Sequence, residues 1–263
     1  PSLGDRVTTP RPHRWTRTLA KPPREARLDP DHLEVERQSE RRRFMRLAGI
    51  GGAVAALGAW WIFAEDERTA AARREILPDG RPRLPPGQKV LKKLKPMGGA
   101  PGSPNKSDFE LRVHGDVEQP FTIDFAELLA LPQQELELDV HCVTGWSLLG
   151  ESWVGVRIAD LAARARPNAD VRHVILEGAH GYTANIRLDE ALAPSSLIAH
   201  RHAGEGLAER NGAPVRALIP ALYFWKSTKW LTGLRFARTD EPGYWEVRGY
   251  HNHADPWLEE RYG

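Results

Sequence analysis

The sequence contains a single cysteine in 263 residues. One thiol cannot form a disulfide within the chain, and it cannot build the paired-cysteine sites that hold zinc or iron–sulfur clusters. The sequence also has no large excess of positive or negative charge, because 37 basic residues nearly balance 35 acidic ones and leave a formal net charge of +2. That balance argues against nucleic-acid binding, which normally uses a basic face. Any metal in this protein therefore needs a cofactor to supply most of its ligands.

Motifs of several common enzyme classes are missing as well. The sequence has no glycine-rich phosphate loop, no GxSxG nucleophile elbow and no HExxH zinc motif, so these classes are unsupported. Nine tryptophans and 21 prolines predict a loop-rich globular domain with aromatic walls rather than a helical bundle.

Three segments of different composition precede the part of the chain with strand periodicity. Residues 1–40 are polar and rich in proline and arginine, which predicts a disordered tail in the cytoplasm,. Residues 47–64 are an apolar run of 18 residues, at the lower limit for a spanning helix, and the basic residues 41–46 place its first end in the cytoplasm,. Residues 65–107 are rich in proline, glycine and lysine, which predicts a linker,.

Residues 41–64 resemble a twin-arginine export signal, in which Arg41 and Arg42 are the arginine pair. Glu40 departs from that pattern, because serine or threonine is common at its position. The alternative is an ordinary N-terminal membrane anchor with a basic flank. Both interpretations predict an extracytoplasmic domain, periplasmic or at the cell surface, and they differ in whether the helix is cleaved.

Residues 108–263 mix short strands with a few short helices. Strands are expected at residues 109–113, 120–123, 135–140, 153–156, 171–177, 182–188, 214–220 and 230–236. Helices are expected at residues 125–130, where Asp124 and Glu127 form a capping box, and at residues 158–165,. This mixture is typical of an α+β domain with a mixed or antiparallel sheet.

Cys142 follows the alternating strand at residues 135–140, and Gly145 breaks the pattern into a loop,. A thiol at the end of a strand, next to His141 and close to Trp146, is a candidate ligand for a soft metal. The alternative is a small buried hydrophobic side chain, a role that lone cysteines often have.

Four motifs follow one another along the domain. They are CVTGWS at residues 142–147, NGAPVR at 211–216, YFWKSTKWL at 223–231 and GYWEVRGYHNHADPW at 243–257. Together they resemble the molybdopterin-binding domain of the sulfite oxidase superfamily, and in detail the small bacterial sulfite oxidase-like oxidoreductases. They are also similar to the catalytic subunits of periplasmic protein-methionine-sulfoxide reductases. The resemblance covers residues 109–262 and implies a domain that binds Mo-molybdopterin.

The resemblance implies a role for each matching residue. Cys142 is the expected catalytic thiolate and metal ligand, beside the two dithiolene sulfurs of the pterin. Arg216 and Lys229 are expected to bind the phosphate of the cofactor, which suits a guanidinium fork and an ammonium group; individually, either could be surface charge instead. The other expected cofactor contacts are Thr144, His180, Asn211, Ser227 and Thr228; His180 could instead be an ordinary loop histidine.

Other aromatic and histidine residues have expected roles in packing. Trp146, Trp225 and Trp230 are expected to wall a dry pocket around the cofactor. His251 and His253 lie two residues apart in a loop, and in the family this stretch packs structurally, so we interpret them as packing rather than as metal ligands.

The implied activity is a transfer of one oxygen atom to or from a small sulfur-centred substrate, with a separate haem or quinone-linked protein as electron partner. Sulfite oxidation usually needs several arginines around the metal. Beyond Arg216, we consider Arg187 and Arg201 as the further candidates, and so small a number favours reduction of a neutral sulfoxide or N-oxide. One alternative is a cofactor-binding or electron-partner module without turnover, because Ala203 stands where relatives often carry asparagine. Another is a tethered extracytoplasmic domain whose cysteine is structural.

Overall fold

The computed structural model describes residues 66–263. The tail and the signal or anchor segment predicted at residues 1–64 lie outside this range and stay predictions. None of the helices between residues 66 and 263 combines the length and the apolar character needed to cross a membrane.

The described residues form short helices and strands. The helices are α2 (Glu67–Arg74), α3 (Phe125–Ala130), α4 (Ile158–Ala165) and α5 (Leu188–Ala191). The strands are β1 (Lys89–Val90), β2 (Glu110–Gly115), β3 (Phe121–Asp124), β4 (Gln134–Cys142), β5 (Trp146–Arg157), β6 (His173–Gly178), β7 (Thr183–Arg187), β8 (Leu197–His202), β9 (Glu205–Gly206), β10 (Arg216–Leu218) and β11 (Leu231–Ala237). Each helix and strand expected in residues 108–263 is present, and the bounds agree within two residues except at one strand. The strand expected at residues 153–156 is the last part of β5, which begins at Trp146.

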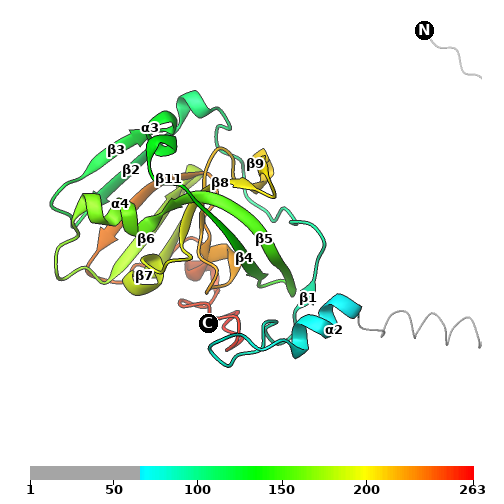
Figure 1. Ribbon diagram of the computed structural model, residues 1–263. Coiled ribbons are helices and arrows are strands. Elements are labelled where there is room, and N and C mark those ends of the chain that lie inside the picture. Colours follow the sequence, from blue (N-terminus) through cyan, green and yellow to red (C-terminus); the bar gives the residue numbers. More distant parts are fainter. Residues whose placement is uncertain (1–65) are drawn as a thin grey trace, which may run out of the picture. The chain divides into compact units, whose positions relative to one another are not determined.

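The strands form two mixed sheets (Figure 1). One has the order β3-β2-β11-β6-β7, and its strand β11 runs parallel to β2 and antiparallel to β6. The other is built on the long strand β5, which pairs antiparallel with β4 and β8 and parallel with β1, while β8 pairs with β9 and β10. The predicted α+β class is therefore confirmed.

The capping box expected before α3 is present. The Asp124 carboxylate accepts from the Glu127 backbone N–H at 2.8 Å, and the Glu127 carboxylate accepts from the Asp124 N–H at 2.9 Å. These reciprocal bonds satisfy two backbone donors that a helix start leaves unpaired. The helix therefore begins at the residue that the sequence indicates.

Two groups of buried side chains stabilise the domain. The larger group includes Leu111, Val156 and Leu234 and draws on both sheets. The smaller group packs on the β4–β5 pair and includes Cys142 and Trp153. Full burial of one such apolar side chain contributes roughly 1.5–3 kcal/mol. Cys142 thus lies among packed side chains, and the long strand pair of β4 and β5 fixes its position.

Part of the segment predicted as a linker packs on the domain. The Arg83 guanidinium binds both Asp139 carboxylate oxygens on β4, at 2.7 and 2.8 Å. The Thr69 hydroxyl of α2 accepts from the Val90 N–H at 3.0 Å, and β1 pairs with the start of β5. A strand of two residues has no detectable periodicity, so β1 was not expected. The role of residues 65–107 as a spacer stays a prediction.

Candidate active site

A cavity of about 320 Å³ lies beside the end of β4. Its lining comes from segments far apart in the sequence, and aromatic rings supply much of it: Tyr182, Phe224, Trp225, Trp230, Trp245 and Tyr250. The other contributions come from residues 95–99, 142–144, 210–211 and 227–229, together with Thr183 and Arg216. Cavities of this size commonly bind small molecules or cofactors.

Cys142 is the last residue of β4 and lines this cavity. A tight turn follows, in which the Gly145 N–H donates to the Cys142 carbonyl at 3.0 Å. Gly145 has a φ of 88°, a left-handed conformation that glycine adopts without steric cost,. The cysteine is 5% exposed, and its sulfur lies 3.3 Å from the Thr144 hydroxyl. Burial raises the pKa of the Cys142 thiol, so the thiolate needs a positive partner, which a soft metal can supply.

His141 is not part of the cavity lining, although it precedes the cysteine. Side chains alternate along a strand, so His141 and Cys142 point to opposite faces. The His141 Nδ1 lies 2.8 Å from the Ser147 hydroxyl, and the ring packs edge-on against Trp257 at 5.0 Å. Burial lowers the pKa of His141 to about 4. His141 is therefore a neutral, buried support behind β4 rather than a second metal ligand.

Two of the three tryptophans that were expected in the cavity wall line the cavity. Trp225 and Trp230 are in its lining, as the resemblance implied. Trp146 differs from its expected place, because its ring packs at 6.1 Å from Phe224 in the smaller core. The start of β5 directs this side chain into the protein, and 4% of it is exposed.

Arg216 and Lys229 bring two cations to the cavity wall. Arg216 is 2% exposed, and its guanidinium donates to the carbonyls of Asn211 at 3.0 Å and Ser227 at 2.7 Å. Burial lowers the pKa of Arg216 to about 9. The Lys229 ammonium donates to the carbonyls of Met97, Gly98 and Arg210. Burial, and then the neighbouring Arg216 charge, lower the pKa of Lys229 to about 8.

These two cations have no carboxylate partner within residues 66–263. Buried charges are normally paired, because desolvation of a lone ion is costly. Two like charges in one wall therefore indicate a site for an anion such as a phosphate group. The cavity thus joins a thiol that fits a soft metal to a cation pair that fits a phosphate.

Comparison with known proteins identifies the family. Residues 97–245 match the family described as the oxidoreductase molybdopterin binding domain. The chain belongs to this family. The uncharacterized oxidoreductase YuiH of Bacillus subtilis (strain 168) is 41% identical over 182 residues, which cover 68% of this chain and 92% of that protein. The resemblance to sulfite oxidase-type molybdopterin-binding domains is confirmed, and the chain is an oxidoreductase of this type.

Two weaker similarities were also found, one to a protein sequence and one to a solved structure. The protein-methionine-sulfoxide reductase catalytic subunit MsrP of Ralstonia nicotianae (strain ATCC BAA-1114 / GMI1000) is 27% identical over 288 residues, covering 92% of this chain and 82% of that protein. The crystal structure of the sulfane dehydrogenase SoxCD from Paracoccus pantotrophus gives a TM-score of 0.47 at 21% identity. That match covers 51% of this chain and 39% of the SoxCD chain.

The structure brings most of the predicted contact residues of this molybdopterin-binding domain to one place. Those that line the cavity are Cys142, Thr144, Asn211, Arg216, Ser227, Thr228 and Lys229. The Ser227 hydroxyl accepts from the Ile219 N–H at 2.9 Å, so it also fixes the turn that carries Thr228 and Lys229. The cavity residues therefore fit the molybdenum cofactor that the family implies.

His180 differs from this pattern. Its side chain is exposed and lies outside the cavity lining, and its Nε2 is 2.8 Å from the Pro101 carbonyl. His180 has a φ of 59°, and its ring is directed toward the Pro101 carbonyl. The geometry gives no support to the expected cofactor contact of His180.

Sequence reasoning missed two groups of lining residues. Residues 95–99 were predicted within the linker, yet they line the cavity, and carbonyls from this segment accept from Lys229. Trp245 and Tyr250 were given no role of their own, and their ring centres lie 5.2 Å apart in the cavity wall. The aromatic density of residues 243–250 was the available signal for them.

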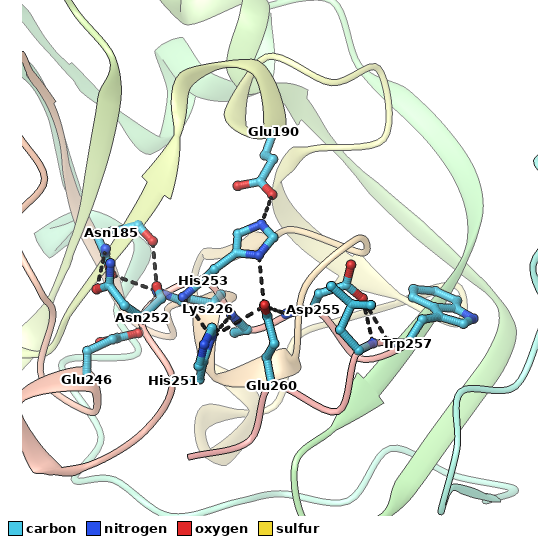
Figure 2. A network of polar contacts seen from close by, with 12 residues as sticks. Asn185, Glu190, Lys226, Glu246, His251, Asn252, His253, Asp255, Trp257 and Glu260 are labelled. Carbon is cyan, nitrogen blue, oxygen red and sulfur yellow. Dashed lines mark hydrogen bonds and ion pairs between the residues drawn. The ribbon is translucent and has the colours of Figure 1, made fainter. Parts of the chain in front are cut away.

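A polar network lies behind the aromatic wall (Figure 2). The Lys226 ammonium is fully buried and contacts the Glu246 carboxylate at 2.7 Å, the Asn185 side-chain oxygen at 2.6 Å and the Asn252 carbonyl at 2.7 Å. The same Glu246 oxygen accepts from the Trp225 indole N–H at 3.0 Å. The network therefore orients a ring that lines the cavity.

His251 and His253 lie in this network and not in the cavity lining. The two ring nitrogens of His253 lie 2.8 Å from the Glu260 carboxylate and 2.7 Å from the Glu190 carboxylate, and His251 Nδ1 lies 3.3 Å from Glu260. Figure 2 shows these side chains converging from α5 and the C-terminal segment. They connect those two segments, as expected for packing residues.

Proposed function

We propose that this protein transfers an oxygen atom to or from a small sulfur-centred substrate by means of a molybdenum cofactor. The observation that carries the proposal is the placement of the Cys142 thiol in one cavity with Arg216 and Lys229, two cations that lack a carboxylate partner within the described residues. A ligand that offers a soft metal and a phosphate matches both features.

Each residue has a separate task toward this cofactor. Cys142 provides the protein thiolate to molybdenum, while Arg216 and Lys229 hold the phosphate by charge-assisted hydrogen bonds. When bound, the cofactor supplies two-electron oxygen-atom exchange at the metal. Trp225 and Trp230 exclude water from the cavity and limit the size of the substrate,.

We infer a neutral substrate from the positions of the arginines and from the name of one relative. Arg187 and Arg201, the two arginines considered as partners for sulfite, do not line the cavity. Arg201 donates to the Gly204 carbonyl in its own turn. Lys95 and Arg210 line the cavity as exposed residues. With Arg216 and Lys229 assigned to the phosphate, a sulfoxide or N-oxide fits better than a sulfite dianion, and the name of the MsrP relative supports the same class.

The proposal includes export of the folded domain by the twin-arginine route and tethering to the membrane. The support is the pattern of residues 41–64, which lies outside the described residues. Electrons are exchanged with a separate haem or quinone-linked protein. Replacing both Arg41 and Arg42 by lysine should retain the protein in the cytoplasm, as measured by cell fractionation. Normal export of that variant contradicts this route.

A turnover assay tests the activity. Protein loaded with molybdenum is assayed with reduced methyl viologen and a dialkyl sulfoxide or amine N-oxide, and separately with ferricyanide and sulfite. The expected result is reduction of the sulfoxide or N-oxide. Sulfite oxidation alone would reverse the proposed direction. Loaded protein without turnover in any assay would favour the alternative, a cofactor-binding or electron-partner module.

A further inference from the structure

The loop after Cys142 is held through its backbone carbonyls. The Cys142 carbonyl accepts from the Gly145 N–H at 3.0 Å and also from the Gln88 side-chain amide at 3.1 Å. The Gly145 carbonyl accepts from the Lys89 N–H at 3.0 Å, and the Val143 carbonyl accepts from the Arg261 guanidinium. Three carbonyls in four consecutive residues are therefore bound by segments distant in sequence.

Gln88 is fully buried directly before β1. Its amide oxygen accepts from the Ser147 hydroxyl at 3.4 Å, and the Ser147 oxygen lies 2.8 Å from His141 Nδ1. The Cys142 carbonyl can only accept, so the Gln88 NH₂ group faces it and the Gln88 oxygen faces the Ser147 hydroxyl,. The amide therefore has one preferred orientation.

Arg261 reaches the same loop from the C-terminal side. One guanidinium nitrogen donates to the Val143 carbonyl and another to the Pro86 carbonyl at 3.3 Å. The planar fork thus joins the cysteine loop to the segment that carries Gln88. The side chain is 20% exposed, and the guanidinium lies 5.3 Å from the centre of the Tyr223 ring.

We propose that Gln88 and Arg261 are positioning residues that hold Cys142 in the orientation in which its thiolate meets molybdenum. Both lie outside residues 97–245, the part that matches the family, and neither lines the cavity. The inference rests on the proposed function for the identity of the metal. A ligand side chain keeps its geometry only when its support is fixed to within about 0.5 Å, and partners behind metal ligands provide that support.

One other buried contact of the same N-terminal segment does not touch the cysteine loop. The Thr69 hydroxyl accepts from the Val90 N–H, and this bond attaches β1 to α2. Thr69 is 1% exposed, so its burial resembles that of Gln88. Thr69→Val is therefore a matched control, because it removes a buried hydrogen bond from the segment and leaves the Cys142 carbonyl bonded to Gln88.

The single cysteine makes thiol labelling of the apoprotein a specific test. Gln88→Met keeps the length of the side chain and removes the amide, while the Cys142 carbonyl still accepts from Gly145. Arg261→Lys keeps the charge and removes the fork. We expect each variant to speed iodoacetamide labelling of Cys142 about fivefold, the change in open population that corresponds to one hydrogen bond. Labelling rates are normalised to those of the unfolded proteins, and Thr69→Val should label at the wild-type rate.

The Mo(V) resonance of partly reduced, molybdenum-loaded protein gives a second readout. Its coupling to the Cys142 β-protons depends on the torsion of the thiolate, so it should change in Gln88→Met and Arg261→Lys and stay unchanged in Thr69→Val. A general loss of stability would alter the yield of loaded protein without moving the signal.

The outcomes separate the positioning role of Gln88 and Arg261 from the proposed function of the protein. Equal labelling of all variants, or an equal rise in Thr69→Val, overturns the positioning role. Unchanged resonances in loaded Gln88→Met and Arg261→Lys overturn it as well. If Gln88→Met does not fold, Ser147→Ala takes its place, because loss of the hydroxyl removes the hydrogen bond that orients the Gln88 amide. Labelling of Ser147→Ala at the wild-type rate would contradict the proposal. Absence of molybdenum from the wild-type protein overturns the proposed function, and with it the purpose of these contacts, whatever the labelling shows.

Discussion

At the scale of single residues, the cavity depends on the charge of Lys229. Its ammonium is held by backbone carbonyls and lies near Arg216, whose positive charge disfavours a second cation. A bound anion reverses this balance, because it attracts both cations. Protonation of Lys229 and binding of an anion are therefore linked.

This linkage predicts a pH dependence of anion binding by the apoprotein. Sulfate is a suitable probe, because it imitates a phosphate and does not titrate near neutral pH. The pKa of Lys229 is about 8, so sulfate should bind more tightly below this pH and progressively more weakly as the pH rises through it. Calorimetric titration over roughly one pH unit on each side of the pKa measures the effect.

Two variants complete the test of Lys229. Lys229→Met should bind sulfate weakly and should lose the change centred near pH 8, keeping only the change that Arg216, with a pKa of about 9, causes at the upper end of the range. Lys106→Met, at an exposed position outside the cavity, should behave like the wild type. Equal pH dependence in Lys229→Met and the wild type would show that another group controls the anion site.

At the scale of elements, the buried ion pair of Lys226 and Glu246 fixes one wall of the cavity (Figure 2). Lys226 belongs to the turn after β10, and Glu246 belongs to the turn at residues 246–248. Glu246 also accepts from the Trp225 indole. Two irregular segments without sheet pairing to each other are thus joined by charge and hydrogen bonds.

Lys226→Met should lower the free energy of unfolding by about 3–5 kcal/mol, because it leaves the Glu246 carboxylate buried without its partner. Denaturant unfolding followed by fluorescence measures the change. Arg157→Met breaks a half-exposed pair with Asp160 and should change stability by less than about 1 kcal/mol,. The double variant Lys226→Met/Glu246→Leu should regain part of the loss, since no lone charge stays buried; a loss equal to the sum of the single losses would contradict this account.

Regular elements were predictable where local chemistry decides them. The capping box at Asp124 and the alternation in residues 135–140 predicted α3 and β4, because both signals lie within a few residues. β1 and β9 have two residues each and form only through pairing with β5 and β8. Such strands depend on tertiary contacts, so no pattern in the sequence indicates them.

At the scale of the whole molecule, the sequence predicted the members of the site better than their surroundings. Cys142, Arg216 and Lys229 were identified from the motifs, and the fold brings them to one cavity. The direction of a loop side chain depends on its turn, which is why His180 lies outside that cavity. The contacts of Gln88 were not predictable, because they follow from the packing of a segment whose composition indicates only a linker.

The central claim is that the Cys142 cavity holds a molybdenum cofactor, and metal analysis tests it most directly. Protein purified from a host that makes the cofactor should contain nearly one molybdenum per chain and give a Mo(V) resonance after partial reduction. Cys142→Ser should change this resonance or lose the metal, because a hydroxyl is a poor substitute for a thiolate toward a soft metal. His180→Ala, which alters a side chain outside the cavity lining, should match the wild type. Folded wild-type protein without molybdenum, or a Cys142→Ser variant with an unchanged signal, would contradict the account.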